Sequence, residues 1–382
     1  MSGNGHLNLS DGLIVFGTYS STNHPRVQVL IEGLRQHNIV VEEINVPIEA
    51  EPRLRARSIT SLATVARTIW RYLRAALRLA TLRFQTNPSA QVVLIPYLGL
   101  TDTVLARALF PTRFLVWDDL APVSQTLEDR SLGGPGLSFL VRRIEGLSIR
   151  CSNLVLYDTA EQMRSMAFVR PRHQKAAIPV GASSVWHRSA ESASSDFSQS
   201  YTALSVIYFG TYVPLHGAEI FGQAIAEVLA RGASLEVTLI GDGTGRQSVE
   251  AALEAFAESV KWHDWVDAPA LAQMVSSSDL SLGIFGTSRK ALQVVPNKAY
   301  QSIAAGTPII TSLSQAQMQA LGEAALYVTP GDATELADLL LALTSNRTPL
   351  KTARQKALAV RTSYTPKAIA SELTEAIRLI SS

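Results

Sequence analysis

Cysteine is almost absent from this chain of 382 residues, in which Cys151 is the only one. A single thiol excludes an internal disulfide framework and any zinc site built on several thiolates. Long hydrophobic runs are also missing, since no uninterrupted apolar stretch reaches the 18 or so residues of a membrane-spanning helix. The N-terminus lacks the charged-then-apolar pattern of a signal peptide. We therefore expect a cytoplasmic protein.

A large charge of either sign is missing too. The chain has 34 basic and 32 acidic residues and a formal net charge of +2, so it is not a polyanion-binding protein as a whole. No Gly-x-Ser-x-Gly, His-Glu-x-x-His, Gly-Lys or Asp-x-Asp sequence occurs. The first three absences exclude serine hydrolases of the elbow type, zincins and P-loop enzymes. With 47% hydrophobic and 17% charged residues, the chain has the composition of a folded protein.

Short apolar segments alternate with helical patterns along the whole chain, as in βαβ units with parallel sheets. This alternation predicts the fold class α/β, with two Rossmann-like βαβ domains. The expected helices cover 26–36, 218–231, 246–260, 298–305 and 333–344. The expected strands cover 12–16, 39–46, 91–97, 113–117, 153–157 and 177–180, and then 203–209, 234–240, 280–284 and 308–310.

A change of composition divides the chain. Residues 183–200 contain eight serines in eighteen positions and no periodic apolar pattern, which is typical of a linker. We expect an N-terminal domain at 1–182, a serine-rich linker at 183–202 and a C-terminal domain at 203–362. A helix at 363–382 would pack back on the first domain through its apolar residues, which are Ile369, Leu373, Ile377 and Ile380.

The segment 282–308 carries the clearest chemical signal. A strand there ends in a glycine-rich loop with Lys290, and a helix opens just after a proline at Lys298. Free backbone N–H groups at a helix start, together with lysines, form a phosphate site. Gln301, one turn further, is placed to bond hydroxyl groups. The alternative is that both lysines are ordinary solvated cations, although the helix dipole disfavours a cation there unless an anion is present.

A glycine turn, Gly241-Asp242-Gly243-Thr244-Gly245, follows the second strand of the second domain. It is a weak match to a dinucleotide fingerprint, because the third glycine comes one residue early. We favour a tight turn for close packing of strand and helix, which is compatible with a ligand above the turn.

Taken together, these segments resemble retaining glycosyltransferases of the family-four type, with the GT-B fold. The resemblance covers most of 203–345. Its marks are the sequences Phe209–Gly217, Ile240–Gly243, Leu282–Thr311 and Leu326–Ala337. In the first domain it is thinner, and comprises Ile178–Gly181 and a pattern formed by Asp118, Thr126, Asp129 and Arg130.

The resemblance implies that the second domain holds a nucleotide-diphosphate sugar, the first holds an acceptor, and transfer occurs in a cleft across which the domains face one another. Catalytic candidates on the acceptor side are Asp118, Asp129 and Arg130, for which a structural ion pair is the alternative. Without Asp-x-Asp, fixed cations rather than a metal are expected to neutralise the leaving diphosphate, and no cofactor beyond the sugar donor as co-substrate is implied. The donor-binding candidates are Gly210, Thr211, His216, Gly217, Gly241, Asp242, Gly243, Lys290, Asn297, Lys298 and Gln301.

Two departures from the family keep other functions open. The paired glutamates of the family fall on Gln293 and Gln301, and its basic pair falls on Thr211 and His216. A glycosyltransferase for a glycan or lipid-linked acceptor in polysaccharide biosynthesis is the first hypothesis. A non-catalytic nucleotide-sugar-binding partner subunit is the alternative, and a GT-B epimerase or phosphorylase is a third.

Acidic residues are missing from one long segment. Between Pro52 and Thr101 there is no Asp or Glu but there are eight arginines, of which Arg67, Arg71, Arg74 and Arg78 recur at helical spacing beside Trp70. A basic amphipathic helix with an aromatic residue is typical of a peripheral contact with an anionic membrane, here the inner membrane face. The alternative is a solvated arginine stripe whose apolar neighbours, including Ile69 and Leu73, pack inward. Nucleic acid is not an expected partner, because aromatic and basic residues do not interleave on a sheet.

Overall fold

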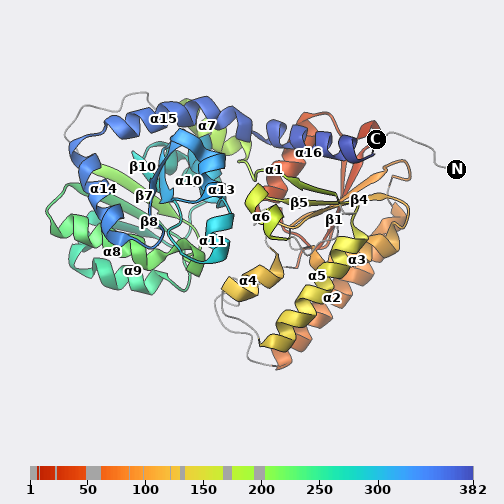
Figure 1. The fold of residues 1–382 in the computed structure, drawn as a ribbon. Helices are drawn as coiled ribbons and strands as arrows, with labels where there is room; N and C mark the ends of the chain where they lie inside the picture. Colours follow the sequence, from red (N-terminus) through yellow and green to blue (C-terminus); the bar gives the residue numbers. More distant parts are fainter. Residues whose placement is uncertain are drawn as a thin grey trace. The chain divides into compact units, whose positions relative to one another are not determined.

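The computed structural model describes residues 7, 9–21, 24–48, 62–85, 87–97, 99–120, 122–129, 134–166, 174–192 and 203–381. The chain forms two compact units. Unit 1 comprises 1–180 and 366–382, and unit 2 comprises 181–365. Each has a parallel six-stranded sheet with helices around it (Figure 1). The expectation of an α/β fold with two Rossmann-like units is therefore confirmed.

The sheet of unit 1 has the strand order β2-β1-β3-β4-β5-β6. The strands β1, β3 and β5 are buried along their whole length, as expected for a parallel sheet that is covered on both faces. The strand bounds are β1 (Leu13–Gly17), β2 (Val41–Asn45), β3 (Val92–Ile95), β4 (Phe114–Asp118), β5 (Leu154–Tyr157) and β6 (Gln174–Ala177).

Helices of unit 1 follow most of these strands, and the last helix of the chain joins them. That helix, α16, packs against α1 and buries Ile369, Leu373 and Ile377 in the core of unit 1. The helix bounds are α1 (Pro25–Gln36), α2 (Leu62–Leu82), α3 (Leu100–Leu109), α4 (Val123–Asp129), α5 (Pro135–Cys151), α6 (Ala160–Ser165) and α16 (Pro366–Ser381).

The sheet of unit 2 has the order β12-β11-β10-β7-β8-β9. Its strands are β7 (Leu204–Phe209), β8 (Leu235–Ile240), β9 (Val260–His263), β10 (Leu280–Leu282), β11 (Ile309–Ser312) and β12 (Ala325–Val328). Its helices are α7 (Ser184–Ser192), α8 (Ala218–Ala230), α9 (Arg246–Leu253), α10 (Ala268–Ser276), α11 (Arg289–Gln293), α12 (Asn297–Ala304), α13 (Gln315–Leu321), α14 (Ala333–Ser345) and α15 (Thr348–Val360).

Two expectations about local structure were wrong. The start of the predicted linker is the helix α7, because the buried side chain of Trp186 stacks on Phe209, with ring centroids 5.6 Å apart, and this packing outweighs the weak helix propensity of serine. Residues 193–202 of that linker lie outside the described residues. The last strand of unit 1 covers 174–177 instead of 177–180, because the apolar residues Ile178 and Val180 are buried beyond the end of the strand ladder.

The contact between α1 and α16 is close enough to require a glycine. A Cβ atom on Gly33 would lie 1.9 Å from the backbone oxygen of Pro366. At Gly33 the two helices therefore approach so closely that no side chain fits between them.

We predict that Gly33→Ala lowers the free energy of unfolding by about 1–3 kcal/mol, the usual cost of overpacking. Gly146→Ala in α5 is the matched control, since a Cβ there meets no atom within 4 Å, and alanine gains up to about 1 kcal/mol in helix propensity. Urea denaturation followed by circular dichroism measures both. Equal midpoints for Gly33→Ala and wild type would contradict the close packing.

Candidate functional site

The strand order of unit 2 reverses between β7 and β10. The chain runs outward from β7 through β8 to β9 on one side, and from β10 through β11 to β12 on the other. The connections that leave neighbouring strands at such a switch point diverge, so ligands of α/β sheets bind at the carboxyl ends of the strands there. The loop 210–217 follows β7, and the loop 283–288 follows β10.

The ammonium group of Lys298 lies at this point and is almost enclosed. The residue is 5% exposed, and its Nζ lies 3.7 Å from the ring centroid of Tyr208. A Cβ atom on Gly210 would be 3.2 Å from the same Nζ. The described residues provide no hydrogen-bond acceptor for it. Burial holds the pKa of Lys298 well below its usual value, so the site contains an amine whose ammonium form a bound anion would stabilise.

His216 lies beside this lysine but adds no charge. Its Nδ1 is 2.7 Å from the hydroxyl of Tyr208. Burial, together with the charge of Lys298, lowers the pKa of His216 well below 6.5. The imidazole is therefore neutral at pH 7, and Lys298 is the group of the pair that would carry positive charge beside an anion.

Glycines allow three loops to meet at the switch point. Gly217 has φ 60°, and a Cβ atom there would lie 2.7 Å from the backbone nitrogen of Gly286. Gly241 has φ 114°, and its Cβ would lie 1.9 Å from the backbone oxygen of Gly210. The glycine turn 241–245 therefore packs directly on the loop after β7, which supports its interpretation as a packing turn.

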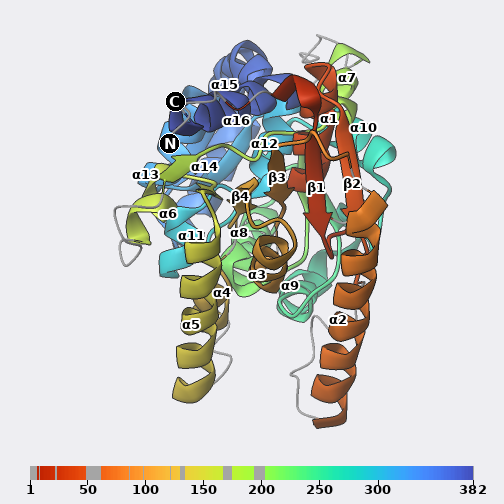
Figure 2. The same cartoon turned by 90° about the vertical axis from the view of Figure 1, so that its right-hand side faces the viewer.

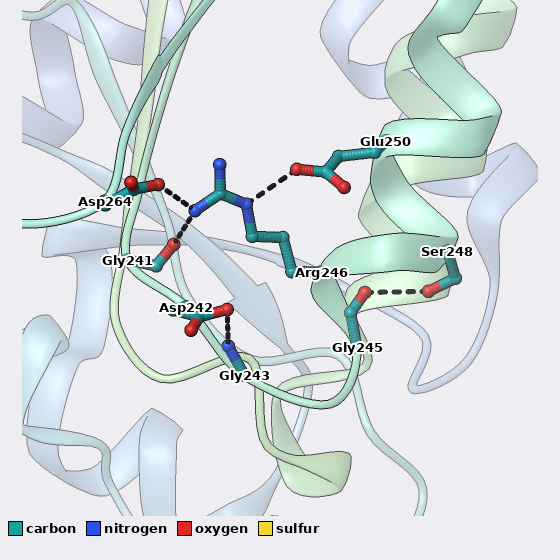
Figure 3. A network of polar contacts seen from close by, with 8 residues as sticks. All are labelled: Gly241, Asp242, Gly243, Gly245, Arg246, Ser248, Glu250 and Asp264. Carbon is teal, nitrogen blue, oxygen red and sulfur yellow. Dashed lines mark hydrogen bonds and ion pairs between the residues drawn. The ribbon is translucent and has the colours of Figure 1, made fainter. Parts of the chain in front are cut away.

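A cation that the sequence analysis did not consider holds this turn. Arg246 donates from Nε to Glu250 Oε1 at 2.7 Å and from Nη1 to the carbonyl of Gly241 at 3.0 Å, and it also pairs with Asp264 (Figure 3). Asp242, predicted to bind the donor, is exposed and accepts from the backbone N–H of Gly243 at 2.8 Å. Because two carboxylates neutralise Arg246, we assign it to positioning the turn. The sequence signal that could have identified Arg246 was its position directly after the glycine turn.

The other donor-site candidates lie around the same edge. Lys290 is half-buried on α11, a helix that contacts the 3-10 turn carrying His216. Asn297 is the first residue of α12, and Gln301 lies one turn further along that helix; both are half-buried. Thr211 is exposed. The structure thus brings together Gly210, His216, Gly217, Gly241 and Lys298 most closely.

In unit 1, Asp118 is the partner of a buried arginine. Both its carboxylate oxygens accept from Arg26 Nε at 2.8 Å, and Arg26 Nη1 donates to the carbonyl of Ile178 at 2.8 Å. Burial raises the pKa of Asp118, and the charge of Arg26 opposes that shift. With an exposed fraction of 0%, Asp118 offers no surface to a substrate here, and the geometry is that of the structural ion pair. The side chain of Asp129 and the whole of Arg130 lie outside the described residues.

The switch point of unit 1 instead holds three residues that the sequence analysis missed. Between β1 and β3, Asp102 Oδ2 accepts from Thr18 N at 2.7 Å and from Thr18 Oγ1 at 2.9 Å. Asp102 Oδ1 accepts from the hydroxyl of Tyr72 on α2. Burial raises the pKa of Asp102, while these hydrogen bonds lower it. The available sequence signal was an acidic residue, Asp102, in the first turn of the helix after β3; its partner in the loop after β1 had no such signal.

The four arginines predicted to contact a membrane, Arg67, Arg71, Arg74 and Arg78, are all exposed on α2. Ile69 and Leu73 do not pack inward, because their exposed fractions are 55% and 51%. In the part of the chain that the structure describes, no helix is long and apolar enough to cross a membrane.

The comparisons with known proteins agree with this geometry. Residues 203–346 match the family model described as "Glycosyl transferases group 1". The matched segment lies in unit 2 and includes Lys298. This match, together with the fold, supports a glycosyltransferase enzyme. No curated protein matches the chain in sequence.

Solved structures share the fold over almost the whole chain. Sucrose-phosphate synthase from Thermosynechococcus elongatus is 14% identical with a TM-score of 0.70, covering 96% of this chain and 98% of that one. UDP-forming trehalose-phosphate synthase from Burkholderia xenovorans is 12% identical with a TM-score of 0.68, covering 97% and 99%. Anabaena HepE in complex with UDP-glucose is 15% identical with a TM-score of 0.64, covering 95% and 98%. These likenesses confirm the GT-B fold.

We predict that binding of a nucleoside diphosphate takes up protons at pH 8. The bound anion stabilises the ammonium form of Lys298, so it raises a pKa that burial has lowered. Affinity is fully present below the pKa of the empty site and is lost as the pH rises through it. Calorimetry with UDP in buffers of different ionisation enthalpy measures the uptake, because a terminal phosphate with a pKa of about 6 is already ionised at that pH.

Lys298→Met should abolish the proton uptake and weaken binding by about 1.5–3 kcal/mol, the range for a hydrogen bond to a charged group. The sequence predicts the same loss for Lys290→Ala. Lys261→Met is the control, because that lysine is 70% exposed on β9. Unchanged affinity in both site variants would contradict the anion site.

Proposed function

We propose that the protein is a retaining glycosyltransferase that moves a sugar from a nucleotide-diphosphate donor to a glycan or lipid-linked acceptor without a metal ion. The observation that carries this proposal is the buried ammonium group of Lys298, which has no acceptor among the described residues and lies beside Gly210 at the sheet switch point. A diphosphate is an anion of the right kind to occupy that position.

The chemistry of transfer suits these residues. When the bond from the sugar to the diphosphate breaks, negative charge develops on the leaving oxygen, and preorganised cations and N–H groups stabilise it. Lys298 supplies a cation that burial has already freed from water. The helix α12 begins at Asn297 without a side-chain cap, so its first backbone N–H groups point toward the same region. An anion site in unit 2 that consists of Lys298 and these N–H groups needs no metal ion to hold the donor.

The choice of donor follows from the comparisons. The Anabaena HepE structures hold UDP, UDP with glucose, or UDP-glucose, and the Burkholderia enzyme is described as UDP-forming. UDP-glucose is therefore the first donor to test here. The retaining outcome is supported by the motif resemblance of Leu282–Thr311. Asp129 and Arg130 remain proposals for the acceptor side, whereas the buried ion pair with Arg26 leaves Asp118 a structural role.

One observation favours an alternative function, that of a non-catalytic partner subunit. Gln293 and Gln301 stand where the resembling family has glutamates, and an amide bonds a ribose hydroxyl without supplying charge. A non-catalytic partner subunit would bind the nucleotide sugar through the same site and transfer nothing. Donor binding without sugar release or transfer to any acceptor would identify that case.

We predict that transfer or donor hydrolysis continues in excess chelator, and that Lys298→Met lowers kcat by about 10²–10³-fold, as for loss of one oxyanion-stabilising donor. Release of UDP from UDP-glucose is the measurement, with Lys261→Met as the control. Activity that disappears in chelator and returns with magnesium or manganese would overturn the metal-independent mechanism. An unchanged rate in Lys298→Met would remove that residue from it.

A further inference from the structure

We propose that the exposed face of α2 and the N-terminal half of α5 form a docking surface for an anionic lipid bilayer. The two-helix surface is defined by the apolar residues Ile69, Trp70, Leu73 and Leu77 of α2 and Leu137, Phe139 and Leu140 of α5, with the arginines Arg67, Arg71, Arg74, Arg78, Arg142 and Arg143. This inference rests on the proposed function only for its use, which is to bring the enzyme to a lipid-linked acceptor.

The two helices project from unit 1 in the same direction. In both views their N-terminal ends extend past the edge of the sheet, well beyond the tips of the strands (Figures 1 and 2). The N-terminal ends of both helices are also less buried than the parts beside the sheet. The first buried residue of α2 among those described is Ala75, and the first of α5 is Val141. Before these positions, the residues whose burial the structure describes are exposed or only partly buried.

Large apolar side chains are exposed on both helices. The four apolar residues of α2 are 51–71% exposed, and the three of α5 are 48–60% exposed. On α2 the positions 69, 73 and 77 repeat every fourth residue and form one stripe, and the arginines form a second stripe roughly a third of a turn away. Exposed apolar area of this extent, bordered by charge, marks an interaction surface.

The charge pattern favours a bilayer over a second copy of the chain. A symmetric dimer places the same patch on both subunits, so arginine would face arginine, and the segment 52–101 has no acidic residue to relieve the repulsion. A bilayer with anionic headgroups meets both requirements at once. Its acyl region accepts Trp, Leu and Phe, and its phosphates accept the arginines.

The docking surface is joined to the switch point of unit 1 through one side chain. Tyr72 lies on α2 among the exposed arginines, and its hydroxyl donates to Asp102, which in turn holds the backbone N–H of Thr18 after β1. Helix α2 therefore fixes the loop after β1 relative to the lipid surface. A lipid-linked acceptor would be presented to the carboxyl edge of the first sheet.

Co-sedimentation with vesicles tests the proposal. Phosphatidylcholine vesicles with and without phosphatidylglycerol are compared at low and high ionic strength. We expect wild type to bind only the anionic vesicles, and binding to fall with salt, because the Debye length shortens from about 10 Å at 0.1 M to 3 Å at 1 M. Changing the four arginines of α2 to glutamine should lower the partition coefficient by roughly 10²–10³-fold.

A second variant tests the apolar stripe, namely Trp70→Ser with Leu73→Ser and Leu77→Ser, which should also lose binding. Trp265→Ser is its control, since that tryptophan is 81% exposed in unit 2. Arg231→Gln with Arg378→Gln is the control for charge at exposed positions elsewhere. Circular dichroism and UDP affinity equal to wild type establish that each variant is folded.

Two results would overturn the proposal. Equal sedimentation of wild type and both site variants would make the two-helix surface a solvated face. A dimer in sedimentation equilibrium that dissociates in the serine variant would assign the surface to self-association. UDP binding is measured separately from vesicle binding, so failure of the lipid surface and failure of the proposed function are distinguishable.

Discussion

Parallel pairing is the constraint on which both units depend. All strands of a parallel sheet end at the same edge, and each connection must cross back over a face of the sheet before the next strand begins. Loops from distant parts of the chain are therefore gathered at one edge, and the reversal of strand order selects the place where they diverge. In unit 2 that place is between β7 and β10, and in unit 1 between β1 and β3. Gly217 and Gly17 show how little room the backbone has there.

The electrostatics of unit 2 follow from that crowding. A cation over a desolvated aromatic ring gains about 2 kcal/mol, but the lowered pKa of Lys298 shows that Tyr208 and the surrounding dipoles do not replace the lost hydration. The same burial lowers the pKa of His216, so Lys298 is the residue of the pair that an anion would hold in its charged form. The amine and the surrounding loops are in position before an anion arrives, and such preorganisation is the general basis of electrostatic stabilisation in enzymes.

The sequence predicted those strands that consist of an almost continuous run of apolar residues, such as the buried strands β1 and β7. It did not predict β9, whose Lys261 and His263 are exposed at the sheet edge, or the helix α7, where one buried tryptophan outweighs several serines. At the site, the position of Lys298 at a helix start indicated that residue, and the family resemblance implied Gly210. The pairs Arg26–Asp118 and Thr18–Asp102 join residues 92 and 84 positions apart, and no local pattern reveals such partners.

Helix α16 makes unit 1 discontinuous in the chain. The backbone leaves unit 1 after Val180 and returns only at Pro366. Ile369, Leu373 and Ile377 then fill a core that Val27, Leu30 and Leu34 of α1 have lined from the beginning. Because synthesis proceeds from the N-terminus and domains fold as units, residues 181–365 emerge complete while unit 1 still lacks one wall. Unit 1 is thus the last to complete its core, and its apolar residues stay exposed until α16 packs against α1.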